Sequence, residues 1–217
     1  MSQRDQEIWD KRYSEGAYAE RQHPSPLLSR WLPRPTSGQR ALDLACGAGR
    51  NTLFLAEAGY TVDAMDISSI GLARATDLAK ARQGADTTHL SINWQQVDLE
   101  EVQLPEQHYD LIILMRYVNE PLIRSVHRAL KPQGYFICEE HLALAPNRLR
   151  EAVTLSGPSN PDFRVSPGDL IEWSRDLRCL KSTEGLSTEP DGRCAALAQI
   201  LAQKIPQPES EPAPGSA

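Results

Sequence analysis

The chain reads Arg40-Ala-Leu-Asp-Leu-Ala-Cys-Gly-Ala-Gly-Arg-Asn51 and, after an apolar helical segment, Tyr60-Thr-Val-Asp-Ala-Met-Asp66. An apolar run, a glycine-bearing turn, a helix and a second apolar run predict a βαβ unit. Gly47 and Gly49 lack a Cβ and tolerate positive φ, so the turn can approach a ligand closely. The first N–H groups of the helix have no partner inside it and would face that ligand. Asp66 ends the second strand, where a carboxylate can accept both hydroxyls of a ribose. These features predict a nucleoside site.

The glycine turn differs from the dinucleotide-binding fingerprint. That fingerprint is Gly-x-Gly-x-x-Gly, and its third glycine allows close packing of the helix on the strand. Here the third position is Thr52, and an acid, Asp43, lies inside the first strand four positions before Gly47. An NAD(P) reductase is therefore the weaker of two alternatives for this turn.

The pattern Asp43-Leu-Ala-Cys-Gly-Ala-Gly49 resembles motif I of class I S-adenosylmethionine (SAM) dependent methyltransferases. The resemblance implies that SAM is the cofactor and that the acid in the first strand orients the turn and the methionine end of SAM. It also implies that the Gly-x-Gly backbone passes under the sulfonium and ribose, and that Asp98 lies beside the adenine amine. The expected cofactor-binding residues are Arg12, Asp43, Ala45, Gly47, Gly49, Asn51, Asp66, Ile67, Asp98, Leu99 and Met115.

The composition is that of an ordinary globular protein. With 217 residues, of which 40% are hydrophobic and 24% charged, the chain is long enough for one domain with a full core. Its 23 basic and 29 acidic residues give a net charge of −6, and they are interspersed. This argues against a nucleic-acid substrate, which normally meets a basic face. No apolar run approaches about 18 residues and the start lacks a signal-peptide h-region, so we expect a cytoplasmic protein without a membrane segment.

The cysteines show no spacing typical of metal ligands. Cys46 lies in the glycine turn, and the other three, Cys138, Cys179 and Cys194, fall in apolar strand patterns. We therefore expect buried free thiols and no metal site.

Strand and helix patterns alternate along the chain. They predict strands at 41–45, 60–65, 89–97, 109–115, 135–140, 177–185 and 194–203, and helices at 3–14, 23–32, 51–58, 68–81, 121–130 and 166–173. Right-handed crossovers then give a Rossmann-like, doubly wound α/β fold with helices on both faces of a mostly parallel seven-stranded sheet. The terminal pair of strands matches the resemblance, which implies an antiparallel last strand. Pro, Glu, Ser and Gly dominate after Pro206, as in a disordered tail.

The fourth strand is followed by Met115-Arg-Tyr-Val-Asn-Glu-Pro121. This segment lacks the (Asn/Asp)-Pro-Pro-(Tyr/Phe) element of amino-directed nucleic-acid and glutamine methyltransferases, which argues against base N-methylation. Arg116 and Tyr117 follow the strand where the acceptor must approach the methyl group. Arg116 could hold an anionic group and Tyr117 could orient the acceptor. The alternative is a surface Arg and a packing Tyr.

His141 ends the fifth strand and has a side chain that ordinarily titrates near neutral pH. It is a candidate general base, with Glu139 or Glu140 as substitutes and a purely structural histidine as the alternative. A soft nucleophile such as a thiolate would need no base. The candidate catalytic residues are therefore His141, Arg116 and Tyr117.

Over residues 5–205 the chain is similar to small class I methyltransferases, nearest to the tellurite-resistance and thiopurine types. The likeness is carried by Trp9-Asp-Lys-Arg-Tyr13, Leu42–Asn51, Tyr109–Tyr117 and Ala129–Gly134. It implies that Trp9, Arg12 and Tyr13 form a lid over SAM. A match to the His and Arg residues that tellurite-resistance enzymes use beyond the fifth strand is not obvious, so a chalcogen acceptor does not follow.

We expect an N-terminal helical cap or lid (1–35), a SAM-binding methyltransferase domain (36–205) and a disordered Pro/Glu-rich tail (206–217). The expected function is SN2 transfer of a methyl group from SAM to a small-molecule acceptor, whether thiol, chalcogen, hydroxyl or amine. A non-catalytic SAM-binding regulatory or partner subunit is the alternative. The sequence identifies neither the acceptor nor the oligomeric state.

Overall fold

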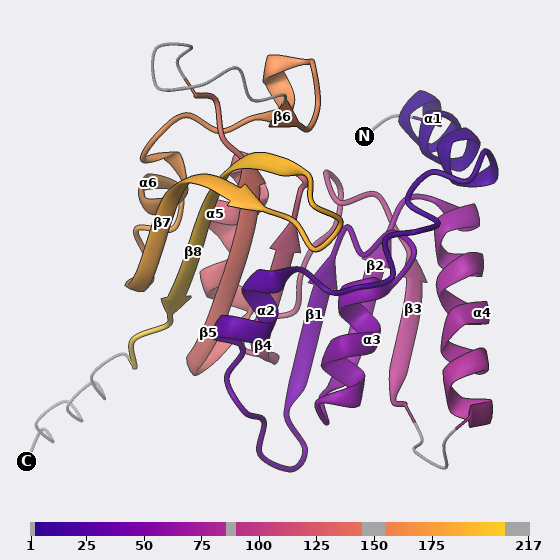
Figure 1. Ribbon diagram of the computed structural model, residues 1–217. Helices are drawn as coiled ribbons and strands as arrows, with labels where there is room; N and C mark the ends of the chain where they lie inside the picture. Colours follow the sequence, from indigo (N-terminus) through magenta and orange to yellow (C-terminus); the bar gives the residue numbers. More distant parts are fainter. Residues whose placement is uncertain (1–2, 86–89, 145–154, 207–217) are drawn as a thin grey trace, which may run out of the picture.

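The computed structural model describes residues 3–85, 90–144 and 155–206. Within them one sheet has the strand order β3-β2-β1-β4-β5-β8, and both β6 and β7 pair with β8 (Figure 1). The strands are β1 (Arg40–Leu44), β2 (Thr61–Asp66), β3 (Ile92–Gln96), β4 (Tyr109–Met115), β5 (Leu130–His141), β6 (Leu155–Ser156), β7 (Arg178–Thr188) and β8 (Cys194–Gln203).

The pairing directions confirm the predicted doubly wound α/β fold. Strands β1 to β5 pair in parallel, β8 is antiparallel to β5, and β7 is antiparallel to β8. The strand order reverses between β1 and β4, which places a topological switch point at the carboxyl ends of these two strands. The two-residue strand β6 is an addition to the seven strands expected.

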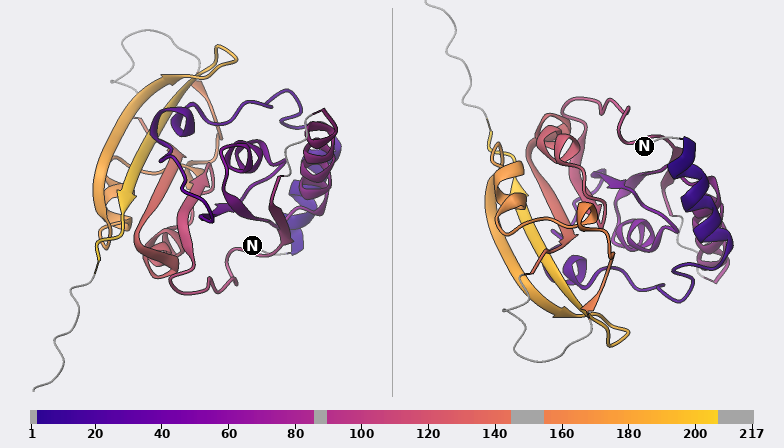
Figure 2. Two further views of the ribbon diagram at one scale, coloured as in Figure 1. Left: turned by 90° about the horizontal axis from the view of Figure 1, so that it is seen from below. Right: turned by 90° about the horizontal axis from the view of Figure 1, so that it is seen from above.

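Helices cover both faces of the sheet, as Figure 2 shows from two sides. They are α1 (Gln3–Ser14), α2 (Pro26–Trp31), α3 (Arg50–Glu57), α4 (Ser69–Ala85), α5 (Glu120–Ala129) and α6 (Asp169–Trp173), with a 3-10 turn at Pro161–Phe163. Ser25 caps α2 by accepting the Leu27 N–H, and Ser68 accepts the Gly71 N–H at the start of α4.

Strand β4 shows why the central strands read as continuous apolar runs. Ile112 and Leu114 pack in a core under α5 and α6, whereas Leu111, Ile113 and Met115 pack in a second core under α2, α3 and α4. All five side chains are buried, because helices cover the sheet on both sides. No helix in the described part of the chain is long and apolar enough to span a bilayer.

Strand β5 begins earlier than predicted. Leu130 already pairs with Tyr109, and the register shifts before Tyr135 pairs with Leu111. Gln133 takes a left-handed φ of 67° in this irregular stretch. Lys131–Gly134, expected to lie between the helix at 121–130 and the strand at 135–140, is therefore an irregular stretch inside β5.

Two further expectations are corrected. Helix α6 begins at Asp169 after Gly168, whose φ is 90°, and does not begin at Ser166. Of the four free thiols, Cys46 and Cys138 are buried, but Cys179 is exposed and Cys194 half-buried. Cys179 lies on β7, most of whose side chains are exposed, so an apolar pattern did not mean burial there. Residues 207–217 of the predicted tail lie outside the described residues.

Candidate active site

The glycine turn joins β1 to α3 in left-handed backbone conformations. Ala45, Gly47 and Gly49 have φ values of 56°, 55° and 80°. A Cβ on Gly49 would lie 2.7 Å from the Ala75 Cβ and 2.8 Å from the Trp94 ring, so Gly49 lets the turn pack against α4 and β3. The glycine at this position is thus required for packing as well as for conformation.

Asp66 ties the carboxyl end of β2 to this turn. Its carboxylate accepts the N–H of Gly47 at 2.8 Å and the N–H of Ser68 at 2.8 Å. Burial raises the pKa of Asp66, and the two backbone hydrogen bonds oppose that rise. The acid is therefore held by two short backbone contacts at the carboxyl end of β2, next to the glycine turn.

Asp43 is fully buried beneath the turn. Thr52 donates a 2.6 Å hydrogen bond to its carboxylate from the first turn of α3. Burial raises the pKa of Asp43 to about 7, and the nearby Asp66 charge adds to the rise. Thr52, at the place of the third glycine of the dinucleotide fingerprint, is a residue whose role the sequence did not reveal.

Helix α1 lies beside the N-terminal end of α4, over the glycine turn (Figure 1). Asp10 accepts hydrogen bonds from the Ser68 hydroxyl at 2.6 Å and from the Ile70 N–H at 3.2 Å. Arg74 of α4 donates to the carbonyl oxygens of Tyr13 and Ala17. These contacts fix the C-terminal end of α1 on α4.

Tyr13 is the residue of α1 that reaches the turn. It is 8% exposed, and a Cβ on Gly47 would lie 2.3 Å from its hydroxyl oxygen. A Cβ on Gly71 would lie 3.0 Å from its ring, so two glycines on different elements make room for one side chain. Arg12, the neighbour predicted to contact the cofactor, is exposed and stacks 5.0 Å over the ring of Trp9.

The other residues predicted to bind the cofactor divide into two groups. Ile67, Leu99 and Met115 are buried at the carboxyl ends of their strands, and Asp98 follows β3 and accepts the Glu100 N–H. Asn51 instead accepts the backbone N–H of Ser25 at 2.9 Å and so holds the start of α2. The Gly47-x-Gly49 turn, a strand-end carboxylate and the Tyr13 hydroxyl together fit a ligand with ribose hydroxyls.

Arg116 is the centre of a polar network at the carboxyl ends of β4 and β5. It has a left-handed φ of 67°, and its side chain is 15% exposed. Its guanidinium contacts Glu139 at 3.0 Å and Glu189, from the β7–β8 turn, at 2.5 Å. Burial opposes the charge, but these two carboxylates raise the pKa of Arg116.

Glu139 is the buried anchor of this network. Besides Arg116, it accepts hydrogen bonds from the Ser25 hydroxyl at 3.0 Å and from the Gln199 amide at 2.6 Å. Its partners come from α2, β8 and the loop after β4. The sequence contained no local signal for this cluster, because its members are far apart along the chain.

His141 lies against the same guanidinium. Its Nε2 is 3.0 Å from Nη1 of Arg116, so the imidazole is placed to accept a hydrogen bond there. Burial lowers the pKa of His141 to about 3, with further lowering by the positive charges of Arg116, Arg164 and Arg21. The ring is neutral at physiological pH and already has a donor.

Tyr117 and Glu140 lie on the other face of the strand ends. The Tyr117 N–H donates to Glu140 at 3.0 Å, and Asn119 donates to the Tyr117 hydroxyl at 3.3 Å. Burial raises the pKa of Glu140 to about 8 and that of Tyr117 to about 12. The second carboxyl oxygen of Glu140 is buried and has no hydrogen-bond partner among the described residues.

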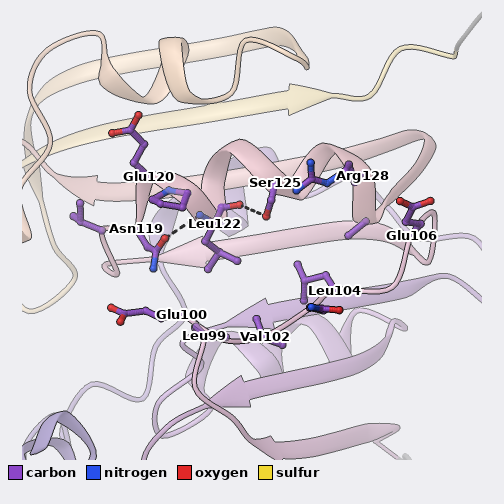
Figure 3. A pocket seen from close by; sticks show the side chains of 14 residues that line it. Leu99, Glu100, Val102, Leu104, Glu106, Asn119, Glu120, Leu122, Ser125 and Arg128 are labelled. Carbon is purple, nitrogen blue, oxygen red and sulfur yellow. Dashed lines mark hydrogen bonds between the residues drawn. The ribbon is translucent and has the colours of Figure 1, made fainter. Parts of the chain in front are cut away.

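A cavity of about 830 Å³ lies between the loop after β3 and helix α5, beside the strand ends (Figure 3). Leu99, Val102, Leu104 and Leu122 point into it, with Glu100, Glu120 and Glu106 around it. Of the predicted site residues, Leu99 alone is part of its lining. The cavity is therefore adjacent to the predicted adenine end and separate from the Arg116 network.

Comparison with known proteins supplies the family. Residues 41–134 match the family model described as a methyltransferase domain. The ubiquinone biosynthesis O-methyltransferase of Pseudomonas syringae pv. tomato is 27% identical over 184 residues, which cover 76% of each chain. An uncharacterized methyltransferase of Synechocystis is 32% identical over 124 residues, covering 54% of this chain and 52% of the relative.

Solved structures agree on the fold. A SAM-dependent methyltransferase from Methanosarcina mazei superposes with a TM-score of 0.65 at 18% identity, over 85% of this chain and 100% of that one. TehB from Haemophilus influenzae superposes with a TM-score of 0.60 at 20% identity, over 92% of this chain and 66% of that one. The motif, the strand order and the family match agree, and the chain belongs to the class I SAM-dependent methyltransferases.

Proposed function

We propose that this methyltransferase acts on a small-molecule acceptor that binds beside Arg116 and reacts as an anion. When bound, SAM supplies a methyl group on a sulfonium, a leaving group that needs no further activation. The chain therefore has to hold both partners in line, exclude water and accommodate the acceptor charge. The observation that carries the proposal is that Arg116 lies at the switch point while the neighbouring His141 is neutral and already hydrogen-bonded.

The cofactor would bind along the glycine turn. In this proposal Asp66 accepts the ribose hydroxyls, Gly47 lies under the ribose and the sulfonium, and Asp98 and Leu99 contact the adenine. Asp66 already binds two backbone N–H groups, which leaves its carboxylate held in a fixed orientation. Residues 1–35 would act as the lid, with Tyr13 as the residue of α1 that contacts the ligand, in place of Arg12.

The chain segments that surround Arg116 and His141 favour a small acceptor. Strand β6 lies close to His141, since a Cβ on Gly157 would be 2.8 Å from the imidazole. The β7–β8 turn contacts Arg116 through Glu189 and Arg21 through Asp191. A duplex or a folded protein would have to displace these segments, which favours a small acceptor.

Proton transfer is the step that the network does not support. A general base works best when its pKa lies near the operating pH. His141 has a pKa of about 3 and faces Arg116, and Glu139 already accepts three donors. Glu140 has a pKa of about 8, but it is fully buried on the other face of the strand ends, away from the Arg116 guanidinium. We therefore assign His141 and Tyr117 a positioning role, and expect the nucleophile to be ionised before it reacts, as a thiolate or an acidic phenol can be. Its lone pair forms the new bond to carbon while the carbon–sulfur pair stays on sulfur.

The test is S-adenosylhomocysteine release from the full chain with a panel of small thiols, phenols and amines. We expect turnover on ionisable acceptors, with a pH–rate inflection that moves with the pKa of the acceptor. Two results would overturn the proposal. One is no turnover on any compound of the panel. The other is an inflection near the ordinary histidine pKa, the same for every acceptor, that disappears in His141→Gln.

A further inference from the structure

The turn between β7 and β8 sends one side chain inward. Residues 188 and 190–193 are exposed, whereas the Glu189 side chain is 9% exposed and contacts Arg116 at 2.5 Å. The backbone of the turn is closed by the Glu189 N–H on Arg193 and the Gly192 N–H on Glu189. A surface loop has thus brought a carboxylate to the end of β4.

The guanidinium of Arg116 contacts two carboxylates, that of Glu139 and that of Glu189. Glu139 is 1% exposed and bound by Ser25, Gln199 and Arg116, so it neutralises Arg116 from within the core. Removing Glu189 would leave that buried pair intact. Glu189 is therefore dispensable for charge balance in the core, unlike Glu139.

The surroundings of Glu189 carry an excess of positive charge. Arg21 and Arg164 lie close enough to His141 to lower its pKa. The pKa of Arg50 is lowered by burial and by the nearby charge of Arg116. Arg164 donates to the carbonyl oxygens of Pro158 and Leu142, and Arg50 to that of His23. These carbonyls do not neutralise the two guanidinium charges, and the nearby acids Glu139 and Glu189 offset that of Arg50 by raising its pKa. Removing Glu189 therefore favours another anion near Arg116.

The backbone of Arg116 is consistent with a binding role. Arg116 is a non-glycine residue with a left-handed φ of 67°, and such strained residues cluster at ligand sites. The guanidinium of this residue meets Glu189 beyond the carboxyl end of β4.

We propose that Glu189 occupies the place of a carboxylate of the acceptor, and that a carboxylate-bearing small molecule displaces it from Arg116. The β7–β8 turn is then a gate that the acceptor opens by exchanging one carboxylate for another. This rests on the proposed acceptor site, but it concerns binding and does not require methyl transfer.

The probe is benzoate, with benzamide as its uncharged match of equal size. Both are titrated calorimetrically into the full chain saturated with S-adenosylhomocysteine, for the wild type, Glu189→Gln and Asp191→Asn. Asp191 is the matched control, because it is an acid of the same turn that pairs with Arg21 at 3.9 Å and not with Arg116. Thermal melts check that each variant is folded, and Glu189→Ala serves as a second variant.

We expect Glu189→Gln and Glu189→Ala to bind benzoate about tenfold more tightly than the wild type, since a competing charge-assisted contact is removed. Asp191→Asn should change benzoate affinity less than twofold, and benzamide should not distinguish the proteins. Equal benzoate affinity in wild type and both Glu189 variants overturns the proposal. So does an equal gain in Asp191→Asn, which would indicate a general charge effect. If Glu189→Gln gains benzoate affinity but the chain methylates no acceptor, the carboxylate site stands and the proposed function fails.

Discussion

The hydroxyl of Thr52 donates a 2.6 Å hydrogen bond to the carboxylate of Asp43, and both side chains are buried under the glycine turn. This contact joins the first turn of α3 to β1 at the position where a dinucleotide fold has a glycine. Close helix–strand packing is therefore achieved here by a hydrogen bond to a strand acid. The residue pair gives a physical reason why the turn differs from a dinucleotide site.

Thr52→Val should destabilise the protein by roughly 1.5–3 kcal/mol, because a buried acid loses a short hydrogen bond while the side-chain volume is kept. Urea unfolding at neutral pH measures this loss. Thr52→Ser retains the hydroxyl and should lose about 0.8 kcal/mol for the missing methyl group. An equal loss in both variants would show that packing, and not the hydrogen bond, stabilises the turn.

Asp66→Ala should weaken SAM binding by roughly 10- to 100-fold, since a charge-assisted hydrogen bond contributes about 1.5–3 kcal/mol. Calorimetric titration with SAM checks this. Asp63→Asn is the matched control, because Asp63 is a buried acid of the same strand that pairs with Arg40 at 2.9 Å, away from the carboxyl end. A SAM affinity of Asp66→Ala within twofold of the wild type would contradict the assignment of the cofactor site.

Gly71→Ala should disturb the contact between α4 and Tyr13. An alanine in place of a helical glycine usually stabilises by about 0.5–1 kcal/mol. Here the new Cβ would lie 3.0 Å from the Tyr13 ring, so the gain should be absent or reversed. In a Tyr13→Ala background the same change should stabilise normally. Identical effects of Gly71→Ala in the two backgrounds, measured by thermal unfolding, would exclude this contact.

Glu140→Gln should change the dependence of stability on pH. Burial raises the pKa of Glu140 from an ordinary 4.5 to about 8, so the folded state binds a proton more tightly than the unfolded state. The contribution of the neutral acid to the free energy of unfolding is complete below pH 4.5 and is lost as the pH rises through about 8. At pH 5 the variant and the wild type should have similar free energies of unfolding.

At pH 9 the same variant should be the more stable by roughly 1–3 kcal/mol, the cost of an unpaired buried group. Denaturant unfolding of both proteins at the two pH values tests this. A constant difference between them across that range would mean that Glu140 is not the titrating group.

The sequence by itself determined the βαβ unit, the strand at Tyr109–Met115 and the doubly wound sheet, because each depends on local periodicity and on turn residues. It also located the glycine turn and Asp66, since a Gly-x-Gly turn and a strand-end acid are both local patterns. The early start of β5 was missed because it depends on the pairing of Leu130 with Tyr109 of β4, which no local pattern reveals.

Only the tertiary structure decided which side chains meet at the carboxyl ends of β4 and β5. Arg116, Glu139 and Glu189 meet within 3.0 Å although they are up to 73 residues apart along the chain. The neutral state of His141 likewise follows from burial and from arginines on three other segments. Charges interact through space and through the solvent that burial removes, and no local pattern of residues encodes either distance or exposure.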